Sequence, residues 1–407
     1  MNRVVIIGAG ECGVRAALAL RDQGFDGTLD LIHGERHTPY ERPPLSKPNA
    51  DGLSLTPIIG AIDLAQKNIT LHRALAATAI DRTLQQVSLS NGENLAYDRL
   101  LIATGATPRP FSLGSHEPPT HFYLRTYDDA VQIFERLHKG SRLIIIGGGF
   151  IGLELAVQAR LKEAHVTLIE SAPRLLGRAV PAEIAAVIEA RHRAEGVEVI
   201  CHASITDITA LGTVTLHDGR VLESDLIVAG IGSLPKTELA EAAGLTIDNG
   251  IAVDRTLRTG DPFIFAAGDC CSFPHPLYDG KRIRIESWRG AQEQGEHAAR
   301  AMLGSVDDYQ AVPWFWSDQY ELGLQMAGLS GDATQTVRRD LADGCFILFH
   351  LAENGRLLAA SGIGLGNNVA RDIRLAEMLI AKRTHPDPAA LRDPALKLKS
   401  LLATHGG

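Results

Sequence analysis

Cysteine and aromatic residues are scarce in this chain of 407 residues. The five cysteines are Cys12, Cys201, Cys270, Cys271 and Cys345, and no two of them have C-x-x-C spacing. This pattern excludes the disulfide framework of a small secreted protein, so we expect a reducing compartment, structural thiols and no metal site. Aromatic residues make up 5% of the chain, and tryptophan occurs three times.

Long hydrophobic runs are missing as well. The longest, LIIIGGGFIGLELA at 143–156, is too short to span a bilayer and is broken by glycines. The first residues run directly into a strand-like segment without the pattern of a signal peptide. The formal charge of −8 is spread over the chain, which argues against nucleic acid as a partner. We therefore expect a cytoplasmic protein that binds neither membranes nor nucleic acids.

Glycine, in contrast, is abundant, with 40 residues, and two copies of one glycine motif stand out. Each copy is an apolar segment, then G-x-G-x-x-G, then a helical pattern. In this motif the first glycine makes a tight turn, the second lets a pyrophosphate approach the backbone, and the third lets the helix pack closely. The motif residues are Gly8, Gly10 and Gly13 in the first copy and Gly147, Gly149, Ile151 and Gly152 in the second.

An acidic residue ends the strand-like segment that follows each copy. Glu35 ends TLDLIHGE and Glu170 ends HVTLIE, where a carboxylate can accept hydrogen bonds from the hydroxyls of an adenosine ribose. A plain surface glutamate is the alternative at both positions, and more so at Glu35 because its spacing from Gly8 is longer. A negative charge at Glu170 disfavours a 2′-phosphate, so a nicotinamide cofactor bound at the second copy would be NADH rather than NADPH.

The duplication extends beyond the glycine motifs. Residues 87–108 and 214–235 align without a gap, and both open with a hairpin signal before a buried strand. Two dinucleotide sites imply a nicotinamide that donates hydride and a second cofactor that receives it. We predict an α/β fold with two tandem Rossmann-like dinucleotide-binding domains and a smaller α+β C-terminal domain. The predicted boundaries are 1–110 and 242–324 for the first domain, 111–241 for the second and 325–407 for the third.

Two further segments indicate which cofactor each domain holds. IATGATP ends one buried strand, and a later one, in TGDPFIFAAGD, ends in a glycine-aspartate pair. This arrangement resembles the two-dinucleotide-binding-domain flavoproteins, which implies FAD in the first domain and NADH in the second. By the same resemblance, Asp269 binds a ribityl hydroxyl, and the helix that follows points its N-terminus at the flavin. The flavin-binding residues so implied are Ala103, Thr104, Gly105, Gly268 and Asp269.

The loop YERPPLSK, at 40–47, lacks the cysteine pair that disulfide reductases of this architecture carry near the flavin. No cysteine lies between Cys12 and Cys201, which excludes a flavin-to-disulfide relay. The loop instead resembles that of the NADH-dependent ferredoxin reductases of bacterial oxygenase systems, and the resemblance covers nearly the whole chain. PWFWSDQY is its most specific segment; others are FYLRTYDDA, GGGFIGLELA and RIESWRGAQEQG.

The resemblance also assigns roles to single residues. It implies that Lys47 and Glu154 form a catalytic pair, with Lys47 near the flavin N5, that stabilises charge on the reduced flavin and helps seat the nicotinamide. Arg42 would lie near the pyrophosphate. For the tryptophans, packing in the core or between domains is the alternative to a place beside the flavin. The remaining cofactor-binding residues so implied are Arg125, Trp288 and Trp316.

The implied function is transfer of hydride from NADH to FAD and of single electrons to a two-iron two-sulfur ferredoxin, which feeds a Rieske-type or haem-thiolate oxygenase. The basic segments KRIRIESWR and RDIRLAEMLIAKR would steer an acidic ferredoxin, although solvated charged faces explain them equally well. Alternatives are a rubredoxin reductase, a monodehydroascorbate-type reductase and a flavoprotein similar to apoptosis-inducing factor. We expect a monomer or weak homodimer, with the third domain packed on the flavin domain.

Overall fold

The computed structural model describes residues 1–48, 52–113, 121–177 and 179–403. The chain forms two compact units, each built from three separate segments. Unit 1 comprises Met1–Glu41, Leu55–Thr107 and Leu234–Pro313, and unit 2 comprises Arg42–Ser54, Pro108–Ser233 and Trp314–Gly407. Each unit is described separately below.

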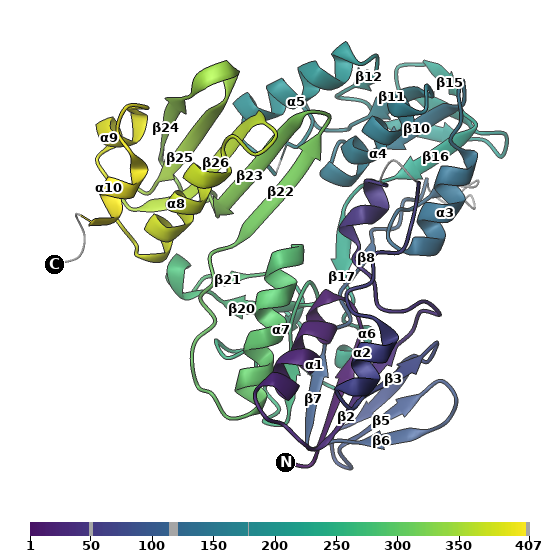
Figure 1. Cartoon of the computed structure of the whole chain (residues 1–407). Coiled ribbons are helices and arrows are strands. Elements are labelled where there is room, and N and C mark those ends of the chain that lie inside the picture. The colour runs from purple at the N-terminus through teal and green to yellow at the C-terminus, as the bar shows by residue number, and fades with distance from the viewer. Residues whose placement is uncertain (49–51, 114–120, 178, 404–407) are drawn as a thin grey trace. The chain divides into compact units, whose positions relative to one another are not determined.

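A parallel five-stranded sheet, in the order β19-β7-β1-β2-β3, is the centre of unit 1 (Figure 1). Its middle strand is a run of β-branched residues that is buried after its first position, as expected for a strand covered on both faces. The strands are β1 (Arg3–Ile7), β2 (Thr28–His33), β3 (Ile69–Arg73), β7 (Arg99–Ile102) and β19 (Ile264–Ala266).

Two helices of unit 1 cross very closely. A Cβ on Gly295 of helix α7 would lie 2.3 Å from the backbone oxygen of Cys12 in helix α1, so only glycine permits this approach. The helices of the unit are α1 (Glu11–Asp22), α2 (Ala61–Gln66), α6 (Glu238–Ala242) and α7 (Trp288–Met302), with the 3₁₀ helix η2 (Pro276–Tyr278). The smaller strands are β4 (Ala77–Asp81), β5 (Gln86–Leu89), β6 (Asn94–Ala96), β18 (Ile251–Ala252), β20 (Cys271–Pro274) and β21 (Arg282–Ile283).

Unit 2 contains a second parallel five-stranded sheet, in the order β12-β11-β10-β16-β9. Its strands are β9 (His121–Phe122), β10 (Arg142–Ile146), β11 (His165–Ile169), β12 (Glu198–Ile200) and β16 (Leu226–Ala229). The helices that accompany it are α3 (Tyr127–Arg136), α4 (Phe150–Leu161) and α5 (Ala182–Ala194). A three-stranded antiparallel sheet is formed by β13 (Ile205–Ile208), β14 (Thr213–Leu216) and β15 (Val221–Glu223).

The predicted duplication is confirmed strand by strand. In both copies an antiparallel three-stranded sheet leads into a central strand of the parallel sheet. After this strand, the first aligned segment continues into β8 (Ala106–Pro108) and the second into β17 (Ser233–Pro235). Asp98 and Asp225 also match in detail. Each accepts a backbone N–H at the start of its copy's first strand, from Arg3 at 3.0 Å and from Arg142 at 2.8 Å.

The C-terminal residues of unit 2 form an antiparallel five-stranded sheet, in the order β22-β23-β26-β25-β24. Its elements are β22 (Trp314–Gln319), β23 (Leu322–Gly328), β24 (Gln335–Asp340), η3 (Ala342–Gly344), β25 (Phe346–Leu351), β26 (Leu357–Leu365), α8 (Ala370–Ala381), α9 (Pro388–Arg392) and α10 (Leu398–Ala403). This sheet begins at Trp314, whereas the third domain was predicted to begin at 325. Helix α4 contacts β22, and the C-terminal sheet belongs to the same unit as the second glycine motif.

No helix in the described part of the chain is both long enough and apolar enough to cross a lipid bilayer.

Candidate cofactor-binding and catalytic site

The first glycine motif lies where β1 turns into α1 in unit 1. Gly8 has φ +109°, and a Cβ on it would lie 2.1 Å from the backbone oxygen of Ala103, so glycine is required by both backbone conformation and space. A Cβ on Gly13 would lie 1.8 Å from the oxygen of Gly8, which makes the third glycine a helix-packing position. Around a Cβ on Gly10, however, no atom of the described residues lies within 4 Å. This open approach to the backbone fits a pyrophosphate at the start of α1.

The carboxyl ends of the neighbouring strands complete this edge of the unit 1 sheet. The backbone N–H of Ala103 donates to the oxygen of Ile7 at 2.8 Å, and that of Ala267 donates to the oxygen of Ile102 at 3.1 Å. Ala103, Thr104 and Gly105 therefore follow β7 beside Gly8, and Gly268 and Asp269 follow β19 beside them. In sheets of this kind ligands bind outside the carboxyl ends of the strands.

The helix that follows the glycine-aspartate pair begins well after it in the sequence. Strand β20, not a helix, begins two residues after Asp269, and the next α-helix, α7, starts only at Trp288. Gly268 is instead held from α7, because its N–H donates to the side-chain oxygen of Gln294 at 2.8 Å. Helix α7 therefore supports the glycine-aspartate turn through a side chain.

The second glycine motif, in unit 2, repeats the geometry of the first. Gly147 has φ +103°, and a Cβ on it would lie 2.5 Å from the oxygen of Gly230. A Cβ on Gly152 would lie 2.8 Å from the oxygen of Gly147, whereas one on Gly149 would have only the oxygen of Gly230, at 3.8 Å, within 4 Å. Ile151, in the first turn of α4, is 47% exposed. The residues of this motif therefore fit a second dinucleotide.

The carboxylate of Glu170 is held by the second glycine loop. It accepts backbone N–H groups from Gly148 at 2.6 Å and from Ala172 at 2.7 Å. These bonds fix its direction and leave lone pairs for ribose hydroxyls. The guanidinium of Arg174 donates to backbone oxygens of Gly177 and Val180, each at 3.0 Å, so the cation nearest in sequence is committed to the backbone. This arrangement suits NADH.

Glu35 belongs to unit 1 and follows β2, as predicted. Its carboxylate accepts a hydrogen bond from the hydroxyl of Tyr40 at 2.5 Å. In the first copy, a tyrosine hydroxyl therefore binds the acid.

The proline loop forms the 3₁₀ helix η1 (Pro43–Ser46) in unit 2. Both prolines stand in its first turn, where a missing backbone N–H costs nothing. The guanidinium of Arg42 donates to the backbone oxygen of Arg125 at 2.5 Å, which joins two of the predicted cofactor-binding residues. The loop therefore fixes the position of the residue that follows it, Lys47.

Lys47 is the centre of a charged cluster within unit 2. Its ammonium group lies 3.1 Å from Glu154 Oε1, 2.9 Å from Asp318 Oδ2 and 5.6 Å from the ring centroid of Trp316. Glu154 is only 7% exposed, so its ion pair with Lys47 offsets much of the cost of burying the carboxylate. The expected meeting of these two side chains is confirmed, and their catalytic roles stay predictions.

Sequence reasoning missed the two hydroxyls that bind the same carboxylate. Ser46 Oγ donates to Glu154 Oε2 and Ser317 Oγ donates to Glu154 Oε1, both at 2.6 Å. Ser46 stands directly before Lys47, and Ser317 lies in the segment PWFWSDQY. Because every second residue of a strand faces the same side, the sequence of β22 indicates that Ser317 lies on the opposite face from Trp316 and Asp318.

The structure places the remaining predicted residues in separate units. Trp288 begins α7 in unit 1, together with the first glycine motif, whereas Arg42, Lys47, Arg125 and Trp316 belong to unit 2.

The cysteines take no part in this chemistry. All five, each within the described residues, are free thiols. Burial raises the pKa of Cys12, Cys270 and Cys271, so these thiols stay protonated and unreactive at neutral pH. Cys270 bonds only weakly to backbone oxygens, 3.3 Å from that of Ala267 and 3.5 Å from that of Ile102.

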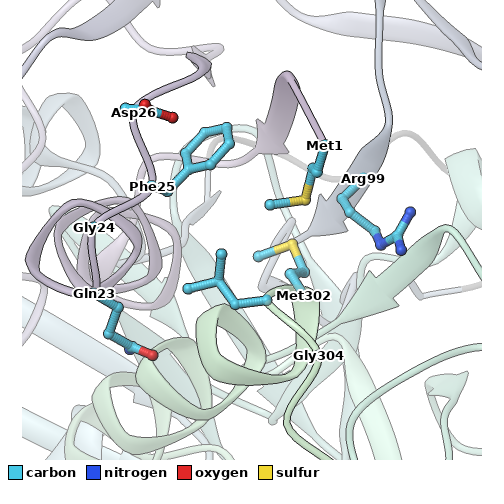
Figure 2. A pocket seen from close by; sticks show the side chains of 9 residues that line it. Met1, Gln23, Gly24, Phe25, Asp26, Arg99, Met302 and Gly304 are labelled. Carbon is cyan, nitrogen blue, oxygen red and sulfur yellow. The ribbon is translucent and has the colours of Figure 1, made fainter.

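A pocket of about 360 Å³ opens in unit 1 at the opposite end of the sheet (Figure 2). The side chains of Met1, Phe25 and Met302 turn toward it, and Arg99 stands on its rim. Met1 precedes β1 and Arg99 begins β7, so this pocket lies at the amino ends of the strands. Because dinucleotides bind at the carboxyl ends, it is not the cofactor site.

Comparison with known proteins decides the family. Residues 2–295 match the family described as pyridine nucleotide-disulphide oxidoreductase, and residues 314–402 match the family described as reductase C-terminal. The chain belongs to the pyridine nucleotide-disulphide oxidoreductase family. This family assignment confirms the predicted enzyme class, the α/β fold class and the cofactors FAD and NADH.

Relatives of this chain include ferredoxin reductase components of dioxygenase systems. The chain is 41% identical over 405 residues to the ferredoxin–NAD(+) reductase component of the anthranilate 1,2-dioxygenase system of Burkholderia cepacia, covering 98% of each chain. It is 40% identical over 419 residues to putidaredoxin reductase of Pseudomonas putida, covering 99% of this chain and 97% of that one. The crystal structure of a covalent putidaredoxin reductase–putidaredoxin complex matches with a TM-score of 0.92 and 37% identity over 99% of both chains.

Proposed function

We propose that this enzyme takes hydride from NADH onto FAD and passes the electrons singly to a two-iron two-sulfur ferredoxin that serves an oxygenase. The observation that carries the proposal is the Lys47–Glu154 ion pair, at 3.1 Å, after a proline loop that has no thiol. Without a redox disulfide, the electrons need an external acceptor. The names of the relatives, which are ferredoxin reductases of dioxygenase and related systems, support an iron-sulfur protein in that role.

The reaction balances as NADH and two oxidised ferredoxins giving NAD⁺, one proton and two reduced ferredoxins. Bound FAD supplies a centre that accepts a hydride and releases its electrons one at a time. The amides at the starts of α1 and α4 bind the two pyrophosphates. Glu170 binds the ribose of NADH, and the ammonium group of Lys47 stabilises negative charge while Glu154 holds it in place.

A reconstituted electron-transfer assay tests this function. Purified protein with FAD, NADH and a panel of two-iron two-sulfur ferredoxins should reduce cytochrome c at least about tenfold faster than protein without a ferredoxin. Rubredoxin and monodehydroascorbate serve as parallel acceptors. If monodehydroascorbate is turned over rapidly and every iron-sulfur carrier leaves the background unchanged, the proposal fails.

Substitution of Lys47 tests the catalytic pair. Lys47→Met should slow the reduction of bound flavin by NADH about 100-fold, because it removes the cation and leaves Glu154 buried without its charge partner. FAD should stay bound, since neither glycine motif changes. Anaerobic stopped-flow absorbance measures the rate constant. Lys67→Met is the matched control, because Lys67 forms an exposed ion pair with Asp22 at 2.9 Å; unchanged reduction in Lys47→Met would remove Lys47 from the mechanism.

The basic segment near Trp288 supports the docking of ferredoxin less strongly than its sequence suggested. Arg289 pairs with Glu293 at 2.8 Å, Arg282 pairs with Asp248 at 3.4 Å, and Arg284 pairs with Glu286. These neighbouring acids neutralise much of the positive charge. Electrostatic steering by this segment is therefore expected to be weak.

We also propose that the enzyme works in the cytoplasm, because its buried, free thiols suit a reducing compartment. The proposed domains are 1–110 and 242–313 for FAD, 111–241 for NADH, and 314–407 for the C-terminal domain, whose sheet starts at Trp314.

A further inference from the structure

A chain of buried hydrogen bonds leads from helix α5 to the carboxylate of Glu154. His192 Nε2 lies 2.9 Å from the side-chain oxygen of Gln319, and Gln319 Nε2 donates to Ser317 Oγ at 2.9 Å. Ser317 Oγ donates in turn to Glu154 Oε1 at 2.6 Å. His192 and Ser317 are 0% exposed and Gln319 is 1% exposed, so the whole chain is shielded from water. All four residues belong to unit 2.

The strand β22 creates this chain through its alternation. Ser317 and Gln319 share one face of the strand with Phe315, whose ring lies 4.5 Å from that of Phe150 in α4. On the other face, Trp316 and Asp318 approach Lys47. One short strand therefore contacts both partners of the ion pair, the carboxylate from its buried face and the ammonium from its exposed face.

The hydrogen bonds all point in one direction. Burial lowers the pKa of His192 to about 4, so its ring is neutral at physiological pH and carries one N–H. Gln319 accepts this N–H with its oxygen and donates from its nitrogen, and Ser317 accepts that bond and donates to Glu154. Aligned donors of this kind complement a negative charge at the end of the chain.

A proton relay does not fit these residues. The side-chain amide of Gln319 accepts on oxygen and donates from nitrogen, so a proton could pass only through an unfavourable tautomer of the amide. The chain is therefore suited to hold Glu154 in place, not to conduct protons.

The hydrogen bonds to Glu154 matter because the ammonium group of Lys47 can pair with either of two carboxylates. Glu154 Oε1 lies 3.1 Å from the ammonium group, and Asp318 Oδ2 lies 2.9 Å from it. The Asp318 side chain is 56% exposed, whereas that of Glu154 is 9% exposed. Without the bond from Ser317, Glu154 would keep its bond from Ser46 to Oε2, but Oε1 would no longer be held against the ammonium group. Lys47 would then follow Asp318 toward solvent.

We propose that Ser317, Gln319 and His192 are positioning residues that hold Glu154 Oε1 against Lys47 and so set the rate of hydride transfer, a role that rests on the proposed function. They act in series, because Gln319 reaches Glu154 only through Ser317, and His192 only through Gln319. If these hydrogen bonds served only to satisfy buried polar groups, their loss would destabilise the fold. The effects of the substitutions on the rate would then not depend on one another in this serial way.

A double-mutant cycle tests the serial arrangement. Ser317→Ala and Gln319→Leu should each lower the rate constant of flavin reduction by NADH about tenfold, and the double variant should be no slower than Ser317→Ala alone. The dissociation constant of NAD⁺ should change less than about twofold, because neither residue belongs to a glycine motif. A double variant slowed about 100-fold, which is the additive result, or single variants with unchanged rates, would overturn the proposal.

Chemical modification of Lys47 tests the same positioning without a measurement of turnover. In Ser317→Ala, Lys47 should be acetylated several-fold faster by acetic anhydride, as measured by peptide mass spectrometry, because its ammonium group is held less firmly. An unchanged acetylation rate would count against the proposal. If Lys47→Met leaves flavin reduction unaffected while acetylation in Ser317→Ala is accelerated, the proposed catalytic role fails and the positioning of the pair stands.

Ser361→Ala is the matched control for these variants. Ser361 on β26 is 4% exposed and lies 3.2 Å from Nε2 of the buried His350, so its loss removes a similar bond in the same sheet. Its melting temperature should fall about as much as that of Ser317→Ala, with no change in flavin reduction or in acetylation of Lys47. A slowed flavin reduction in Ser361→Ala would show that general loosening of the C-terminal sheet, and not positioning of Glu154, explains the effect.

Discussion

A chain that carries Gly10→Val is expected to be purified without its flavin. The backbone at Gly10, with φ −76° and ψ −172°, is one that valine adopts readily, so the substitution adds no strain. No atom in the described part of the chain lies within 4 Å of the added Cβ, so the fold should accept it as well. The branched side chain would instead occupy the space through which the pyrophosphate approaches the start of α1. We expect the affinity for FAD to fall at least about 100-fold, or about 3 kcal/mol.

Absorbance at 450 nm of the purified protein, followed by titration of the apoprotein with FAD, measures this loss. Gly260→Val is the control, because Gly260 is an exposed glycine of the same unit with equally open surroundings and no positive φ. A yellow Gly10→Val protein with the affinity of the parent chain would show that FAD does not bind at the first motif.

Gly149→Val should have the complementary effect, with flavin retained and NADH binding lost. Gly149 has φ −85° and ψ 174°, and only the oxygen of Gly230, at 3.8 Å, lies within 4 Å of an added Cβ. The side chain would block the pyrophosphate of NADH at the start of α4. We expect kcat/KM for NADH to fall at least about 100-fold, mainly through KM, because the residues that carry the chemistry are unchanged.

Steady-state kinetics with ferricyanide as the acceptor measures this change without a ferredoxin. Gly331→Val, at an exposed and equally open glycine of unit 2, should leave KM unchanged. Loss of the yellow colour in Gly149→Val, together with a raised KM for NADH in a Gly10→Val protein that stays yellow, would reverse the assignment of the two cofactors.

The glycine motifs and the duplicated strands could be predicted because their information is local. A glycine with φ +109° beside a neighbouring strand, as at Gly8, imposes the same residue type wherever this turn occurs. The hairpin signals at Gly92 and Gly219 likewise mark turns in which both glycines have positive φ, +88° and +87°. Such constraints are visible in a short window of sequence.

The donors around Glu154 could not be predicted in the same way, because they come from segments far apart in sequence. Ser46, 108 positions before Glu154, and Ser317, 163 positions after it, meet on one carboxylate only in the folded chain. Nothing near Ser46 marks it as a partner of an acid, and the alternation along β22 indicates which face Ser317 lies on but not that it meets Glu154. The support of the turn at Gly268 could not be predicted for a related reason, because it comes from Gln294, in a helix that begins much later.

Because of the proline loop, the boundaries of the sequence repeat differ from the boundaries of the folded units. Residues Arg42–Ser54 lie inside the first copy of the duplicated sequence, yet they belong to unit 2 and supply both Ser46 and Lys47 to Glu154. A second copy excised at its own sequence boundaries would keep a buried acid and lose its cation. The two halves are therefore not interchangeable modules. A recombination event that brought in a new nicotinamide-binding domain would also have to bring this loop, because otherwise the buried glutamate of that domain would lose the cation that neutralises it.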